Sequence, residues 1–104
     1  MVGDYVLCRN LAASVRHYGG PAAFDVVDVP DFRPIGAFVR SAFAEEGIQI
    51  GVLALALHGT LSDAFRLGWP SDDGERRILA ELRVRERLQF RVADVRYAIS
   101  QRYA

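Results

Sequence analysis

Cys8 is the only cysteine of the chain and the residue best suited to covalent chemistry. It stands in "GDYVLCRN", beside Arg9 and three residues after Tyr5, where a helix is expected to begin. A helix N-terminus and an adjacent arginine both favour a thiolate, so Cys8 could form a mixed disulfide with a partner protein or a low-molecular-weight thiol. The competing interpretation is a small buried hydrophobe, because free cysteine is among the most buried residue types.

Three acidic residues recur every third position at the end of a β-branched segment: Asp25, Asp28 and Asp31. Side chains spaced in this way along a strand and its exit do not converge on one point, and neither histidine has a partner at a metal-ligand spacing. We therefore interpret them as solvated turn acids and expect no metal. The sequence also lacks the glycine-rich motifs that cradle phosphates, so no cofactor is predicted.

Arginines form a third group near the C-terminus. If this region is helical, one stripe contains Arg76, Arg83, Arg87 and Arg91, a possible surface for phosphate or for an acidic partner. Glu75, Glu81 and Glu86 lie close enough to pair with several of them, which favours a solvated face. Trp69, between Gly68 and Pro70, is expected to cover an edge of the core or to form a contact patch.

Composition limits the class of protein. The chain has 104 residues, 51% of them hydrophobic, which predicts one globular domain over residues 1–104. Thirteen basic residues balance thirteen acidic ones, so nucleic acid is an unlikely partner and no field attracts the chain to a membrane. The sequence shows no signal peptide and no apolar run long enough to span a bilayer. We expect a soluble cytoplasmic protein.

Hydrophobic periodicity and helix-breaking residues predict the elements that position these side chains. We expect a helix over about 6–18, ended by Gly19, and strands over 23–29 and 48–57. A second helix should begin at Pro34 and end before Gly47, and a short helix should lie within 60–68. Alternating strand-like and helical segments indicate an α/β fold with a small central sheet flanked by helices. Because 48–57 is apolar on both faces, we expect helices on both sides of this strand.

Residues 78–92 fit two patterns. Apolar and polar residues alternate over 80–92, as in a strand, but Val84, Leu88 and Val92 also keep helical spacing. A helix is favoured because the segment lacks Gly and Pro, is rich in helix formers and would make an unusually long strand. The C-terminal region is therefore predicted to be helical.

The opening segment "GDYVLCRNLAASVRHYGGPAAFDVVDVPD" resembles the DCC thiol-disulfide oxidoreductase family. That family carries D-G-x-C-x-x-C before a helix and a strand with an acidic exit, and Gly3, Leu7, Cys8 and Arg9 fit it. "HGTLSDAFRLG" and "VADVRYAISQRY" resemble two later family segments. The resemblance implies a thioredoxin-like fold with a helical C-terminal extension and Cys8 at the second motif cysteine.

Tyr5 stands where the family has its first cysteine, and Val2 replaces the leading Asp. A dithiol cycle needs two thiols, one to attack and one to release the mixed disulfide. The resemblance therefore implies a degenerate oxidoreductase-like protein, at most a monothiol redox factor through Cys8. The alternative is a non-catalytic protein-interaction or regulatory module on the same fold, with Tyr5, Arg9 and Trp69 as contact residues. Whether the chain is an enzyme stays open at this point.

Overall fold

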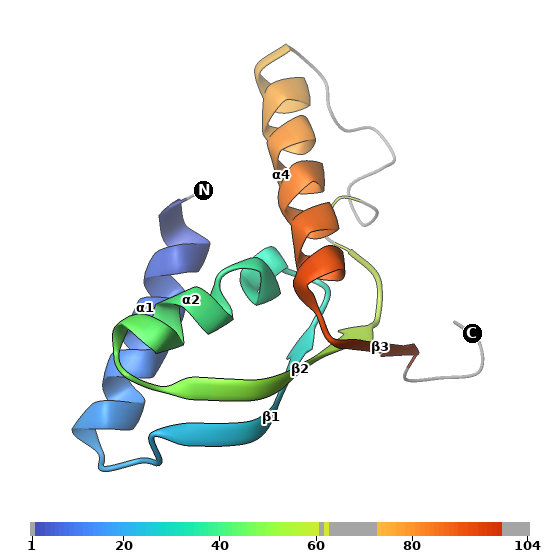
Figure 1. Cartoon of the computed structure of the whole chain (residues 1–104). Coiled ribbons are helices and arrows are strands. Elements are labelled where there is room, and N and C mark those ends of the chain that lie inside the picture. Colours follow the sequence, from blue (N-terminus) through green and yellow to red (C-terminus); the bar gives the residue numbers. More distant parts are fainter. Residues whose placement is uncertain (1, 61, 63–72, 99–104) are drawn as a thin grey trace.

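The computed structural model describes residues 2–60, 62 and 73–98. In chain order these form helix α1 (Val2–His17), strand β1 (Ala23–Pro30), the short 3-10 helix η1 (Pro34–Ala37), helix α2 (Val39–Glu45), strand β2 (Gln49–Leu57), helix α4 (Asp73–Val92) and strand β3 (Val95–Ala98) (Figure 1). The chain is thus a small α/β structure.

The three strands form a parallel sheet in the order β1-β2-β3. Strand β2 is central: Ala54 pairs with Asp28 on one side and with Val95 on the other. Parallel strands need crossover connections, and the segment from η1 to α2 supplies the one between β1 and β2. Both edges of β2 are therefore paired, and its side chains Leu53 and Leu55 are almost completely buried in the core.

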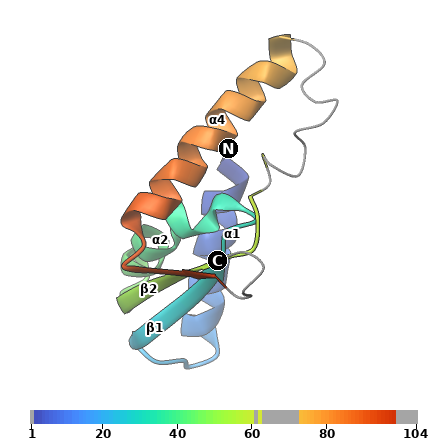
Figure 2. The same ribbon diagram turned by 90° about the vertical axis from the view of Figure 1, so that its right-hand side faces the viewer.

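Helices α1, α2 and α4 all lie on the same side of this sheet, as the two perpendicular views show (Figure 1, Figure 2). Cys8, Phe43 and Leu53 belong to the core formed between the helices and the sheet. On the opposite face Val26 is 58% exposed, and the Tyr97 hydroxyl donates a hydrogen bond to Asp28. The described part of the structure is therefore a two-layer arrangement, and its helices cover one face of β2 instead of the two faces that the sequence predicted.

Local sequence explains where α1 ends. Gly19 has a φ of +71°, a left-handed conformation that glycine adopts without a steric penalty. The Gly20 amide then donates to the Val15 carbonyl at 2.8 Å, which satisfies one of the last carbonyls of the helix. This confirms the stop predicted from the two glycines.

Helix α4 is docked on η1 through one close contact. The buried Gln89 side chain accepts a hydrogen bond from the Gly36 amide, with a distance of 2.7 Å between Oε1 and N. A Cβ atom on Gly36 would lie 2.7 Å from Gln89 Oε1 and 3.1 Å from Val29 Cγ2. The absence of a side chain at Gly36 therefore lets α4 approach η1 closely. This contact helps to position α4 and the side chains that it carries.

The predicted strands 23–29 and 48–57 and the helical assignment of 78–92 are confirmed. The second helix is confirmed in part, because the segment from Pro34 is divided into the 3-10 helix η1 and the separate helix α2. Two further predictions were wrong. Helix α1 begins at Val2, so Cys8 lies inside the helix and not in its first turn. Residues 95–98 form a strand instead of helix, because the free edge of β2 offers Val95 and its neighbours backbone partners in a parallel ladder.

Candidate ligand-binding site

The Cys8 side chain is completely buried. Its Sγ donates a hydrogen bond to the Ile35 carbonyl at 3.5 Å. Burial, and to a smaller extent the Asp4 carboxylate, raise the pKa of the Cys8 thiol above its ordinary value. The thiol is thus protonated at neutral pH and out of reach of solvent, which is typical of a packing cysteine and not of a nucleophile.

Tyr5 and Arg9, the predicted contact residues beside Cys8, join α1 to the end of α2. The Tyr5 hydroxyl and Arg9 Nη1 both donate to Glu45 Oε2, and Arg9 Nη2 donates to Glu46 Oε1 at 3.2 Å. The hydrogen bond from Tyr5 and the charge of Arg9 lower the pKa of the Glu45 carboxyl. Both side chains therefore already serve an internal contact between helices.

Trp69, the third predicted contact residue, lies outside the described residues. The same holds for the short helix expected within 60–68, apart from Thr60 and Ser62. The structure therefore leaves both predictions as they stand.

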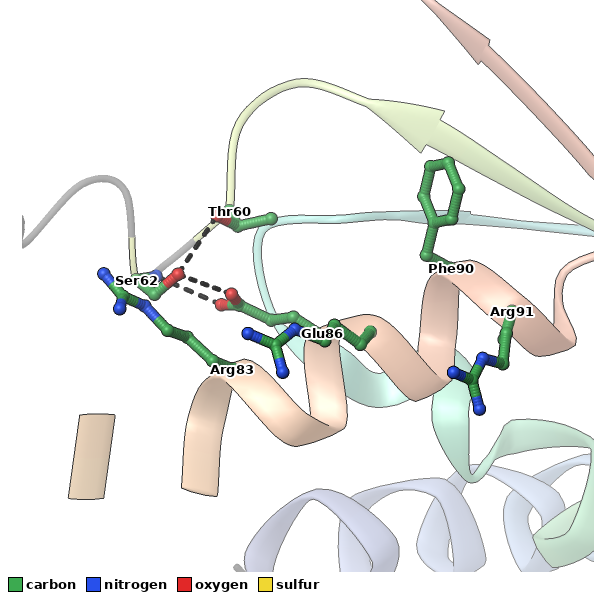
Figure 3. Close-up of a pocket in the computed structure, with 7 residues that line it drawn as sticks. Thr60, Ser62, Arg83, Glu86, Phe90 and Arg91 are labelled. Carbon is green, nitrogen blue, oxygen red and sulfur yellow. Dashed lines mark hydrogen bonds between the residues drawn. The ribbon is translucent and has the colours of Figure 1, made fainter. Parts of the chain in front are cut away.

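A hollow of about 430 Å³ lies beyond the carboxyl end of β2, between the chain that leaves this strand and α4 (Figure 3). It is lined by Thr60, Ser62, Arg83, Glu86, Arg87, Phe90 and Arg91. Its volume is within the usual range for small-molecule sites. Open parallel α/β sheets generally bind ligands beyond the carboxyl ends of their strands, so both size and place favour a ligand site.

Glu86 and Ser62 form the buried polar side of this hollow. Glu86 is 8% exposed and its Oε1 accepts a hydrogen bond from Ser62 Oγ at 2.5 Å, while Oε2 accepts one from the Ser62 amide at 3.1 Å. Thr60 Oγ1 lies 3.4 Å from Ser62 Oγ. The carboxylate is thus turned toward Ser62, as Figure 3 shows, and its charge is held by two donors.

Arg83, Arg87 and Arg91 follow one another at four-residue intervals along the side of α4 that lines the hollow. Within the described part of the chain, no ion pair joins any of the three to a carboxylate. Glu86, which the sequence suggested as a partner for them, binds Ser62 instead. Guanidinium groups present forked donors that match phosphate and carboxylate oxygens, so this wall is suited to an anion.

Arg76, the fourth arginine of the predicted stripe, does not line the hollow. It lies 3.8 Å from Asp73 in the first turn of α4. The structure thus brings three of the four arginines together at one site.

Asp31 holds the turn that leads from β2 into the hollow. Its Oδ1 accepts hydrogen bonds from the amides of His58 and Gly59 at 2.8 and 3.0 Å, and the residue is 6% exposed. The interpretation of Asp31 as a solvated acid was therefore wrong, although the other two acids of that series are exposed. A buried carboxylate with two amide donors positions Thr60 at the rim of the hollow.

Phe90 completes the site beside the arginines. The Arg96 guanidinium lies 4.6 Å from the centre of its ring, and Arg96 Nε donates to the Phe90 carbonyl at 2.6 Å. A cation against an aromatic face in this position restrains the ring at the edge of the hollow. Phe90 is half-exposed and offers the ligand an apolar surface.

Sequence reasoning found the arginines but missed the roles of Glu86, Ser62 and Phe90. A signal was available for Glu86, because it shares the buried face of α4 with Leu79 and Leu82. A charged residue in an apolar register usually marks a buried polar contact. Ser62 carried no comparable signal, since its partner is distant in sequence.

The described residues contain no group of three or more His, Cys, Asp or Glu side chains placed to hold a metal ion. None of the helices they form is both long and apolar enough to cross a membrane. No protein-family model matches the sequence, and no curated protein or solved structure matches it.

Proposed function

We propose that this protein is a non-catalytic binding module whose ligand is a small anionic molecule carrying phosphate. The observation that carries the proposal is the wall of Arg83, Arg87 and Arg91, which lacks an acidic partner among the described residues and lines a ligand-sized hollow. Arginines that have no acidic partner among the described residues and that line a concave surface are well placed to bind an anion from outside the chain.

A small ligand fits this geometry better than an extended polyanion. The three arginines converge with Ser62 and Glu86 on one hollow, whereas a nucleic acid strand would need basic residues that continue beyond it. The neutral balance of the whole chain also provides little long-range attraction for a polyanion.

Each lining group has a distinct role in the proposed site. The arginines bind the phosphate oxygens, and Phe90 contacts the apolar part of the ligand. Glu86 positions Ser62, and the remaining lone pairs of its carboxylate can accept hydrogen bonds from a hydroxyl or amine of the ligand. No covalent step is assigned, because the described lining lacks a nucleophile with an exposed base beside it.

The monothiol redox function, membership of the DCC family, the thioredoxin-like arrangement and the cytoplasmic location stay predictions. Burial of Cys8 and the raised pKa of its thiol weigh against redox use, since thiol exchange requires an accessible thiolate. The sequence offered a non-catalytic protein-interaction or regulatory module as the alternative. The present proposal keeps the non-catalytic role and replaces the protein partner with a small anion, and the three arginines that line the hollow support it.

Titration calorimetry with inorganic pyrophosphate tests the proposed function. We expect saturable binding to the wild-type chain, and a loss of affinity of about tenfold in Arg83→Gln and in Arg87→Gln, since each removes charged hydrogen bonds to the ligand. Arg77→Gln is the matched control, because this exposed arginine of α4 does not line the hollow and should leave affinity unchanged.

Absence of pyrophosphate binding, or equal losses in all three variants, would contradict the proposal. Equal losses would mean that the charge of α4 as a whole, and not the hollow, attracts the anion. Raising the salt concentration should weaken binding to the hollow less than it weakens diffuse attraction.

A further inference from the structure

The outer side of α4 carries an apolar stripe whose side chains are exposed in the described part of the structure. Val84, Leu88 and Val92 recur every four residues and are 61%, 41% and 37% exposed. Their spacing resembles that of a core-facing stripe, yet the buried side of the helix contains Leu79 and Leu82 instead. The helix thus has two apolar sides, and only one of them contacts the body of the protein.

Basic residues border this outer stripe. Arg87 and Arg91 lie beside Val84 and Leu88 around a shallow hollow on the helix surface. Six arginines and four acids occur in α4, and the acids are Asp73, which lies close to Arg76, Glu75, Glu81, and the buried Glu86. The exposed surface of α4 is therefore more positive than the neutral chain as a whole.

The exposure of these side chains, and not the projection of the helix, makes this surface accessible. Val84, Leu88 and Val92 lie in the C-terminal half of α4, whereas it is the N-terminal half that projects beyond the other described elements (Figure 1, Figure 2). The convex surface of a helix can enter a deformable lipid interface, whereas a protein partner would need a matching groove.

We propose that α4 docks in the interface of an anionic lipid bilayer, with Val84 and Leu88 inserted and the bordering arginines on the headgroups. An exposed apolar stripe bordered by basic residues is typical of helices that lie in a membrane interface. A second copy of the chain is a poorer occupant, because a two-fold interface centred on this stripe would bring arginines against arginines. The inference shares Arg87 and Arg91 with the proposed phosphate site, but it rests on the exposed apolar stripe, which that site does not use.

Vesicle co-sedimentation measures this docking directly. We expect the wild-type chain to bind vesicles of equal parts phosphatidylglycerol and phosphatidylcholine, and to bind pure phosphatidylcholine vesicles far more weakly. The double variant Val84→Asn, Leu88→Asn should lose about tenfold or more in its partition coefficient, because two apolar side chains no longer enter the interface. Leu11→Asn on α1, which replaces a side chain that is 46% exposed, should keep wild-type binding.

Three results would overturn the proposal: no binding to anionic vesicles at low salt, equal binding to both kinds of vesicle, or unchanged binding of the double variant. Circular dichroism must show native helix content in every variant. Dimers of the wild type that the double variant does not form would instead assign the stripe to a second copy.

These experiments distinguish failure of the phosphate-binding proposal from failure of the membrane-docking proposal. The double variant should still bind pyrophosphate, because neither substituted residue lines the larger hollow. Arg83→Gln should lose pyrophosphate and keep vesicle binding, since Arg83 lines that hollow and not the shallow one between Val84 and Leu88.

Discussion

Helix α1 and helix α4 both carry charged and apolar side chains, but the fold uses them differently. On α1, Tyr5 and Arg9 bind the two glutamates at the end of α2. On α4, Arg83 and Arg87 line a hollow without an acidic partner in the described chain. The residues that looked most reactive in the sequence thus hold the structure together, while the proposed binding site lies at the other end of the chain.

Proximity to an opposite charge explains the difference. Helix α1 packs against α2, which ends at Glu45, and both Glu45 and the following Glu46 face Arg9 of α1. Helix α4 packs against η1, which contributes no acidic residue. The charge of a helix side chain is neutralised only where the neighbouring element supplies a residue of opposite charge.

Gly36→Val should give the largest effect on this comparison. The new side chain would overlap Gln89 and Val29, so α4 would have to move away from η1 at a cost of about 2–3 kcal/mol. Urea denaturation measures the change in the free energy of unfolding. Gly3→Ala on α1, where a Cβ meets nothing within 4 Å, is the control and should be neutral or slightly stabilising. Equal stability of Gly36→Val and wild type would show that this contact does not position α4.

Glu86→Ala should destabilise the protein by about 2 kcal/mol, because the buried amide and hydroxyl of Ser62 would both lose their acceptor. Thermal or chemical unfolding measures it. Glu81→Ala, an exposed site on the same helix, should change stability by less than about 0.5 kcal/mol. Similar effects of the two substitutions would mean that Glu86 is not the structural carboxylate of the hollow.

Cys8→Ala should cost about 1 kcal/mol, which is the loss of a small buried group. The same burial should make the native thiol react with iodoacetamide at pH 7 at least about tenfold more slowly than in urea, because little thiolate forms and access is blocked. Native labelling as fast as in urea would restore the redox interpretation of α1.

Asp94→Asn should give the smallest effect, and one that depends on pH. Hydrogen bonds from Arg40 and from the Leu53 amide lower the pKa of Asp94 in the folded state. The carboxylate therefore contributes stability above its unfolded pKa of about 3.9, and this contribution is lost as the pH falls through the lower folded value.

Melting temperatures of wild type and Asp94→Asn at neutral pH and near pH 3 measure this contribution. The wild type should be the more stable at neutral pH, and the gap should narrow in acid. A difference in melting temperature that does not change with pH would mean that the charge of Asp94 does not contribute to stability.

Much of the fold could be predicted from local sequence. Short-range sterics and hydrophobic periodicity specify three features of the fold: the β-branched strand before Pro30, the apolar strand 49–57 and the end of α1 at the two glycines after Tyr18. The arginine interval along α4 was equally visible, since helical spacing alone places Arg83, Arg87 and Arg91 on one side.

What the sequence by itself determined is therefore the type of most elements and the side of α4 on which the arginines gather. The tertiary structure decided the partners: Cys8 is buried, Asp31 holds the turn after β2, residues 95–98 join the sheet, and Glu86 turns to Ser62. The reason is that the free energy of a buried thiol, carboxylate or backbone amide depends on the atoms that surround it, and those atoms come from residues far apart in the chain.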